Sequence, residues 1–162
     1  MHGSTVRKIV GTDSPSPIRS VVVDDNAILL RVWQRVLNNA DHLAFVTSDP
    51  EEALVKIDVE TVDVAICDIV MPRMDGLELA KRIRSHHPNI VLILTTAYPC
   101  KFQEMDLGLG PQDVFFLAKP YLDIDRVREF ITAIIRGGTT QQFPKIRTRD
   151  GTTIHLVNSP AK

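Results

Sequence analysis

Hydrophobic and polar positions along the chain alternate between the spacing of a strand and the spacing of a helix. Residues 20–23 form a short β-branched run, which predicts a buried strand. From Leu29 to Ala40 the apolar residues recur three and four positions apart, which predicts a helix with one apolar face. Asp25 or Asn26 lies just before this helix and can cap it.

The same reading extends along the rest of the chain. Asp49 and Pro50 mark the start of a second helix, because a capping side chain followed by proline suits a helix N-terminus. The remaining apolar runs predict strands at residues 43–46, 62–67, 90–94 and 114–118, and helices at residues 76–86 and 124–135. Strand and helix thus alternate, which indicates a parallel sheet with helices on both faces. In such α/β folds, ligands bind beyond the carboxyl ends of the strands.

The composition narrows the class of protein. The chain has 162 residues, of which 44% are hydrophobic and 24% charged, as expected of one globular domain. The net charge of −1 gives no reason to expect binding to nucleic acid or to a membrane surface. No apolar run is long enough for a membrane helix. The two cysteines, Cys67 and Cys100, fit a reduced, cytoplasmic protein better than a secreted one.

Charged and hydroxyl side chains follow four of the predicted strands. Asp24 and Asp25 follow the first strand, Asp68 the third, Thr96 the fourth and Lys119 the fifth. If the strands are parallel, these side chains meet at one edge of the sheet. Two carboxylates about 4 Å apart repel by roughly 4 kcal/mol at an effective dielectric of about 20. A divalent cation relieves this repulsion, and Mg²⁺ suits carboxylate, carbonyl and phosphoryl oxygens.

A carboxylate whose charge is neutralised by a metal can approach an anionic phosphoryl donor and attack its phosphorus. Lys119 would then meet one phosphoryl oxygen as a point charge. Thr96 would donate a hydrogen bond to another phosphoryl oxygen. The chemistry expected of this edge is therefore phosphoryl transfer, assisted by positioning and by charge stabilisation.

With these motifs in this order, residues 18–138 resemble the receiver domain of two-component response regulators. The motifs are Asp24-Asp25 after an apolar strand, Asp68 followed by Met71-Pro72 and Met74-Asp75-Gly76, Thr96-Ala97, and Lys119-Pro120. The resemblance implies a flavodoxin-like (βα)5 fold, a doubly wound parallel sheet with strand order 2-1-3-4-5. It also implies a signalling switch that accepts a phosphoryl group from a histidine kinase or a histidine phosphotransfer protein. Such a switch modifies itself and is not a turnover enzyme.

The resemblance assigns the metal and the acceptor. It implies that Asp68 is the phosphoacceptor. It implies that Asp25 and Asp68 ligate Mg²⁺ together with the backbone carbonyl of Val70. Asp24 would join this site directly or through a water molecule.

The resemblance also assigns the switch. Thr96 would close on the phosphoryl group, and Phe116 would occupy the aromatic switch position. The bond before the proline in Lys119-Pro120 is expected to be cis. Val70 and Tyr98 hold the positions that modulate phosphoryl lifetime in this family, and we expect them to hinder the attacking water and slow dephosphorylation.

Residues 98–113 depart from the family, which places an amphipathic helix here. Gly108, Gly110 and Pro111 predict a short or irregular fourth helix instead. This segment belongs to the output face of the family, so the standard dimer through that face is brought into question. A homodimer stays open as an assembly.

The two ends of the chain lie outside the resemblance. Residues 1–17 are expected to form a flexible leader, whose first residues resemble the remnant of an expression tag. Residues 139–162 form a C-terminal extension with a hairpin signal at Asp150-Gly151. An isolated hairpin is marginal in water, so it should dock on the receiver, pair across a dimer, or belong to a truncated output domain.

Two other functions fit parts of the pattern. A phosphatase with an aspartate nucleophile would carry a second aspartate two residues after the first, where this chain has Val70. A pseudo-receiver would be a binding module that is never phosphorylated. The complete set of Asp25, Asp68, Thr96 and Lys119 argues against the pseudo-receiver.

Overall fold

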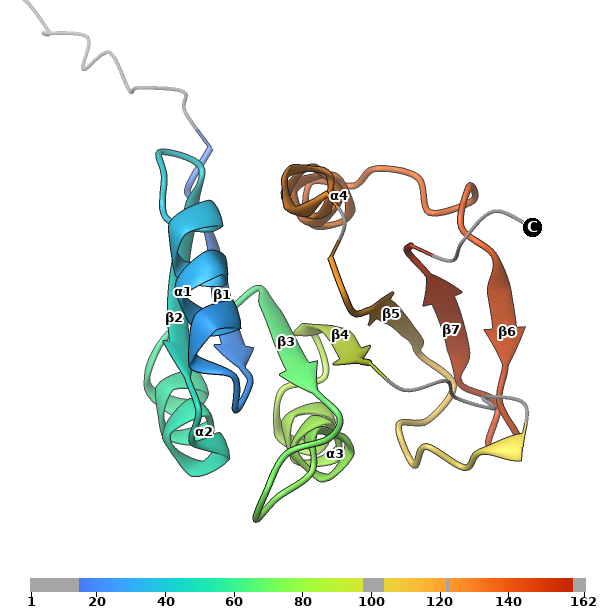
Figure 1. Ribbon diagram of the computed structural model, residues 1–162. Coiled ribbons are helices and arrows are strands. Elements are labelled where there is room, and N and C mark those ends of the chain that lie inside the picture. The colour runs from blue at the N-terminus through green and yellow to red at the C-terminus, as the bar shows by residue number, and fades with distance from the viewer. Residues whose placement is uncertain (1–14, 98–103, 122, 159–162) are drawn as a thin grey trace, which may run out of the picture.

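The computed structural model describes residues 15–97, 104–121 and 123–158, which form one sheet flanked by helices (Figure 1). Helices α1 (Ala27–Val36) and α4 (Ile124–Ile135) cover one face of the sheet, and α2 (Pro50–Val59) and α3 (Gly76–His86) cover the other. The predicted α/β architecture, with helices on both faces, is confirmed. Among the described residues, no helix is both long and apolar enough to cross a membrane.

The sheet has seven strands in the order β2-β1-β3-β4-β5-β7-β6. Their bounds are Ile18–Val23 for β1, His42–Thr47 for β2, Val64–Asp68 for β3, Val91–Thr96 for β4, Asp113–Ala118 for β5, Lys145–Arg147 for β6 and Thr153–Leu156 for β7. The first five strands pair in parallel, so the expected order 2-1-3-4-5 is confirmed. The carboxyl ends of β1, β3, β4 and β5 therefore lie along one edge.

The central strands are apolar on both faces because both faces are covered. Successive side chains of a strand point to opposite faces of the sheet. Val21 and Ala65 accordingly pack with α2 and α3, whereas Val22 and Ile66 pack with α1 and α4. All five residues of β3 are buried, so Asp68, its last residue, ends an otherwise apolar strand.

Asparagine and aspartate side chains start the helices. Asn26 caps α1 and accepts hydrogen bonds from the N–H groups of its first turn, and Asp49 does the same for α2. The end of α1 differs from the prediction, since the helix stops at Val36 and Ala40 lies outside it. The Asn39 side chain donates to the Val36 carbonyl at 3.2 Å, and the Asn39 N–H donates to His42. This local bonding replaces the next helical turn.

The segment between β4 and β5 contains no α-helix in its described part, residues 104–112. The helix labelled α4 therefore corresponds to the fifth helix of the receiver pattern. The side chains of Leu107 and Leu109 are buried against the core, so the segment still covers that face of the sheet. The irregular conformation expected from the two glycines fits this part, and residues 98–103 lie outside the described residues.

The C-terminal extension forms a β-hairpin that adds to the receiver sheet. Strands β6 and β7 pair antiparallel, and β7 pairs in parallel with β5. Gly151, in the turn, has a φ of 86°, which favours glycine. Of the three arrangements considered for the hairpin, docking on the receiver is the one observed.

The proposed division at residue 138 stays a prediction, because the extension shares the sheet of the receiver. Residues 1–14 of the expected leader lie outside the described residues, and residues 15–17 have no regular secondary structure.

Candidate functional site

The predicted site residues meet at the carboxyl edge of the sheet. The register pairs Val23 with Cys67, the residues just before Asp24 and Asp68. It also pairs Asp68 with Thr95, and Thr96 with Ala118, the residue before Lys119. Four distant segments of the chain are thereby brought side by side.

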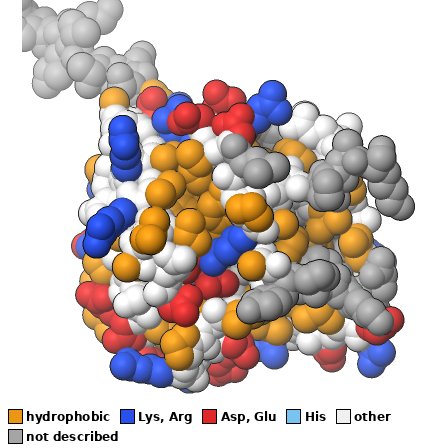
Figure 2. Space-filling model, viewed as in Figure 1, with side chains coloured by type: hydrophobic (Ala, Val, Ile, Leu, Met, Phe, Trp, Pro, Cys, Tyr) orange, Lys and Arg blue, Asp and Glu red, His pale blue; other side chains and the backbone are white. Residues whose placement is uncertain are grey.

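Lys119 bridges two buried carboxylates. Its Nζ lies 2.7 Å from Oδ2 of Asp24 and 3.1 Å from Oδ2 of Asp68. Asp24 is only 1% exposed and Asp68 only 4%. The ammonium group is thus the internal counter-charge of the pair, and it offsets a repulsion that burial strengthens. Figure 2 shows acidic and basic side chains beside one another near the middle of this face, with hydrophobic side chains around them.

Asp25 completes an acidic cluster that could hold a cation. One carboxylate oxygen from each of Asp24, Asp25 and Asp68 lies within 4.8 Å of the others. Asp25 is exposed, so the cluster opens to solvent on its side. The N–H of Asn26 donates to Oδ1 of Asp24 at 2.8 Å, and the N–H of Val70 donates to Oδ1 of Asp68 at 3.3 Å. These bonds hold the two buried carboxylates in fixed orientations.

Burial sets the protonation of the two central groups. Loss of solvent raises the pKa of Asp68, because the nearby ammonium of Lys119 offsets only part of the effect and the charge of Asp24 adds to it. Burial lowers the pKa of Lys119, but the hydrogen bond and charge of Asp24, with Tyr121 and Asp68, outweigh this, so its pKa lies above the usual value. Lys119 is therefore protonated at neutral pH.

The loop after β3 is shaped by a close backbone contact. The Gly76 N–H donates to the Ile69 carbonyl at 2.9 Å, and the Ile69 N–H donates to the Thr95 carbonyl at 2.8 Å. A Cβ on Gly76 would lie 1.9 Å from the carbonyl oxygen of Asp68. Asp75 caps α3 by accepting from the Glu78 N–H at 2.7 Å. Asp75 and Gly76 thus open the helix predicted at residues 76–86, and the backbone of Gly76 packs against the carbonyl group of Asp68.

Of the residues expected to switch, Thr96 ends β4 and Phe116 lies within β5. Thr96 is 2% exposed and Phe116 is 8% exposed, so both start from buried positions. The Lys119–Pro120 bond is cis, as the resemblance implies. Val70 is 51% exposed at the mouth of the site. Tyr98, the other residue expected to affect phosphoryl lifetime, lies outside the described residues.

Cys67, next to Asp68, is a free and fully buried thiol. Burial, together with the charge of Asp68, raises its pKa to about 12. Cys67 is therefore a core side chain rather than a reactive nucleophile. Cys100 lies outside the described residues.

One residue at this edge was not anticipated. The Asn158 side chain accepts from the Ala118 N–H and donates to the Ala118 carbonyl, each at 2.7 Å. A single asparagine near the end of a polar tail gives no sequence signal for such a contact. Only the docking of the hairpin brings it to β5.

Comparisons with known proteins agree with this geometry. The family described as "Response regulator receiver domain" matches residues 21–132. The chain belongs to the response regulator receiver domain family. It is 33% identical over 144 residues to the DNA-binding transcriptional regulator NtrC of Salmonella typhimurium, covering 86% of this chain and 30% of that protein. Among solved structures, the CheY-like receiver domain protein of Methanospirillum hungatei matches with a TM-score of 0.64 and 24% identity, covering 75% of this chain and 95% of that one.

As a receiver domain, the chain acts in two-component phosphorelay signalling. It spans about a third of the length of such relatives as NtrC. A protein-glutamate methylesterase/protein-glutamine glutaminase of Hydrogenovibrio crunogenus is 32% identical over 123 residues, and the match covers 72% of this chain but only 32% of that enzyme. Receiver domains are generally not turnover enzymes, and in such relatives they are joined to other domains.

Proposed function

We propose that Asp68 accepts a phosphoryl group from a phosphohistidine of a histidine kinase or histidine phosphotransfer protein in a Mg²⁺-dependent reaction. The observation that carries this proposal is the position of Lys119 Nζ, within 3.1 Å of both Asp24 and Asp68. A fixed cation beside a buried carboxylate is suited to meet an oxygen of the phosphoryl group that the carboxylate receives.

Asp24, Asp25, Asp68 and the backbone carbonyl of Val70 would hold the Mg²⁺. The donor set fits, because clustered carboxylate oxygens with an opening to solvent are what this ion requires. When bound, the ion neutralises the carboxylates so that an anionic donor can approach. Asp25 is exposed and lies on the open side, so it would be the ligand nearest to solvent.

In the transfer itself, a carboxylate oxygen of Asp68 forms a bond to phosphorus while the bond from phosphorus to the histidine nitrogen breaks. The electron pair of the broken bond stays on that nitrogen, and the product is an acyl phosphate on Asp68. Lys119 pairs with one phosphoryl oxygen, and Thr96 donates a hydrogen bond to a second. The added charge thereby gives Lys119 and Thr96 a new partner.

This new pairing would be the switch. Thr96 ends β4 and Phe116 lies within the neighbouring strand β5, so movement of Thr96 toward the phosphoryl group would change the packing around Phe116. The shift would bias a face that binds partners, among them a second copy of the chain. The domain would modify itself without turning over a substrate, and it would do so in the cytoplasm. Val70, at the mouth of the site, would slow hydrolysis of the acyl phosphate.

The test uses acetyl phosphate, which needs no partner protein. With Mg²⁺ present, the intact mass of the protein should increase by one phosphoryl group, and the increase should vanish in Asp68→Asn. Asp63→Asn is the matched control, because Asp63 lies just before β3 and should leave the increase unchanged. An unmodified parent protein that also fails to bind beryllofluoride with Mg²⁺ would show a pseudo-receiver, and steady turnover of a phosphate ester would show a phosphatase.

A further inference from the structure

Asn158 holds the backbone next to Lys119 through two hydrogen bonds from one side chain. Its carboxamide acts as a peptide group would in a neighbouring strand, since it accepts from the Ala118 N–H and donates to the Ala118 carbonyl. We propose that Asn158 is a positioning residue for phosphoryl transfer, which fixes Lys119 through Ala118 and makes the chemistry depend on the C-terminal hairpin. The inference rests on the proposed function of Asp68 and Lys119.

The end of β5 is held from both sides. On one side, the Lys119 N–H donates to the carbonyl of Thr96 at 2.9 Å. On the other side, both backbone groups of Ala118 are taken by Asn158. Because β7 ends at Leu156, opposite Phe116, it has no residue opposite Ala118. Without Asn158, the last residue of β5 would lose its partners on that side.

The hairpin brings Asn158 to this place. Phe116 pairs with Leu156 in the β5–β7 register, and the Val157 N–H donates to the Phe116 carbonyl at 2.9 Å. The chain therefore follows β5 from the switch position to the residue before Lys119. Figure 1 shows β7 alongside β5, with β6 outside it.

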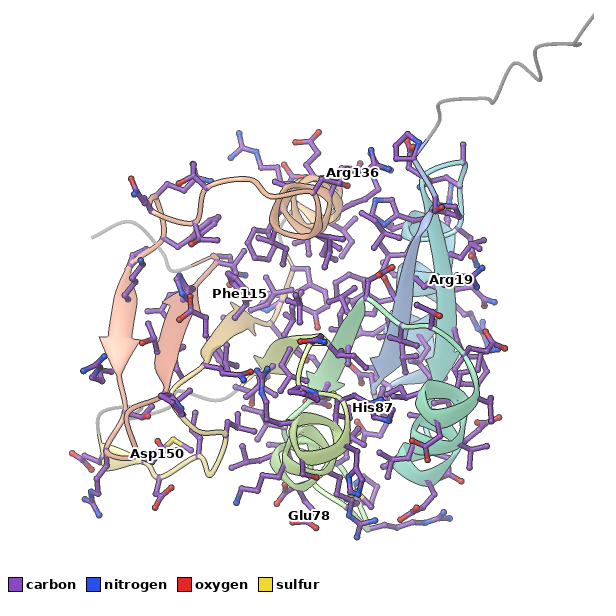
Figure 3. All side chains as sticks on the ribbon, turned by 180° about the vertical axis from the view of Figure 1, so that it is seen from behind. Arg19, Glu78, His87, Phe115, Arg136 and Asp150 are labelled. Carbon is purple, nitrogen blue, oxygen red and sulfur yellow. The ribbon has the colours of Figure 1, made fainter. Side chains whose placement is uncertain are left out.

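The other end of the hairpin is anchored separately. The Gly108 N–H donates to Oδ2 of Asp150 at 2.9 Å, and the Thr152 hydroxyl donates to the Gly110 carbonyl at 2.7 Å. Figure 3 shows Asp150 at the turn of the hairpin, and β7 runs from this turn toward Asn158. The hairpin thus joins the irregular β4–β5 connection at one end to the lysine of the site at the other.

Positioning matters because Lys119 has two short contacts to satisfy. Its Nζ reaches Asp24 at 2.7 Å and Asp68 at 3.1 Å, so a small shift of its backbone moves it away from the position of the phosphoryl oxygen. Small misplacements of this kind reduce rates strongly, because preorganised charge must be in place before the transition state. The carboxylates of Asp24 and Asp68 are held by other contacts and would keep their places.

The test compares Asn158→Ala with the parent in the full chain, by the rate of phosphorylation with acetyl phosphate at saturating Mg²⁺. We expect the rate to fall about tenfold, which corresponds to about 1.4 kcal/mol in the barrier. The Mg²⁺ affinity, measured by calorimetry, should stay within about twofold, because the carboxylates are untouched. Amide hydrogen exchange at Ala118 should become faster, which tests the hydrogen bond itself even if the variant is less stable.

The control is Thr152→Val, which removes a buried hydroxyl bond at the far end of the hairpin and should leave the rate unchanged. An equal fall in both variants would overturn the proposal, since it would reflect general loosening of the hairpin. So would an unchanged rate in Asn158→Ala.

A double-mutant cycle separates positioning of Lys119 from any other role. In a Lys119→Ala background, Asn158→Ala should change the rate by less than about twofold, because the group that Asn158 positions is gone. A tenfold fall in that background would overturn the proposal. If Asp68 were not the acceptor, the parent protein itself would not gain mass, so failure of the proposed function is seen before Asn158 is tested.

Discussion

The backbone of Gly76 lies against the carbonyl of Asp68 so closely that a side chain on residue 76 would begin 1.9 Å from the carbonyl oxygen and 2.6 Å from its carbon. Both atoms belong to the backbone of a buried strand and cannot give way. Helix α3, which follows β3, is therefore held against Asp68, the proposed acceptor. A receiver built in this way needs glycine at residue 76 for space rather than for an unusual φ.

Gly76→Ala should lower the free energy of unfolding by about 3 kcal/mol, the upper part of the range for overpacking, and should abolish phosphorylation by acetyl phosphate. Chemical denaturation and intact mass measure the two effects. Gly110→Ala is the control, because a Cβ there meets nothing within 4 Å and only the φ of 72° is unfavourable. A Gly76→Ala variant that is phosphorylated at the parent rate would contradict this account.

Lys119→Met should make the protein without metal less stable and its response to Mg²⁺ larger. Removing the ammonium leaves Asp24 and Asp68 facing each other without a counter-charge, which costs about 3 kcal/mol when a buried pair is broken. Mg²⁺ would then supply the missing positive charge, so the rise in melting temperature on adding Mg²⁺ should exceed that of the parent. Lys145→Met, on exposed β6, should behave as the parent does. Equal Mg²⁺ responses in both variants would count against the role of Lys119 as internal counter-charge.

Asp68→Asn should stabilise the protein at pH 7 in the absence of Mg²⁺. Burial raises the pKa of Asp68 above its ordinary value of 3.8. Lys119 opposes this rise in the pKa only in part, and the charge of Asp24 adds to it. The folded state therefore holds a proton that the unfolded chain has released, and the stability of the parent falls as pH rises from 3.8 through the raised pKa. The variant lacks this loss of stability. The difference in the free energy of unfolding between Asp68→Asn and the parent should therefore grow as the pH rises from 3.8 through the raised pKa, and then level off. Denaturation curves at a series of pH values measure this difference. A difference that becomes smaller as the pH rises would contradict the prediction.

Ile154→Ala should report whether the hairpin is docked in solution. Ile154 is fully buried and pairs with Val114 across the β5–β7 contact. Truncation should lower the free energy of unfolding by about 3 kcal/mol, as for other buried isoleucines. Ile28→Ala is the comparison, because Ile28 is 71% exposed and should lose little. Matching small losses would mean that the hairpin is detached.

The alternation of strands and helices and the site at the strand ends were both predictable from the sequence. Periodicity locates the buried strands, and the rule for parallel sheets then places Asp24, Asp68 and Lys119 at one edge of the sheet. This succeeded because each of these residues directly follows or ends an apolar run, so the local pattern already determines where its backbone lies. The bridging of both carboxylates by Lys119 was not predictable, because it depends on side-chain geometry across three strands.

Other features depend on contacts between distant parts of the chain. The hairpin was predicted from Asp150-Gly151. Its pairing with β5 was not, because that pairing is made by backbone groups, which leave no signal in the sequence. The same holds for Asn158, whose role appears only after docking. The end of α1 was misjudged because Asn39 bonds locally to Val36, a competition that apolar spacing does not reveal.

The hairpin also determines which strand forms the exposed edge of the sheet. Because β7 takes the edge of β5, that side of the described sheet ends in β6, a strand of three residues that carries Lys145 and Arg147. Short edges with positive side chains resist pairing with strands of other chains. The extension therefore acts as a lateral cover against edge-to-edge aggregation, and a chain cut before residue 139 would expose the whole length of β5 to its neighbours.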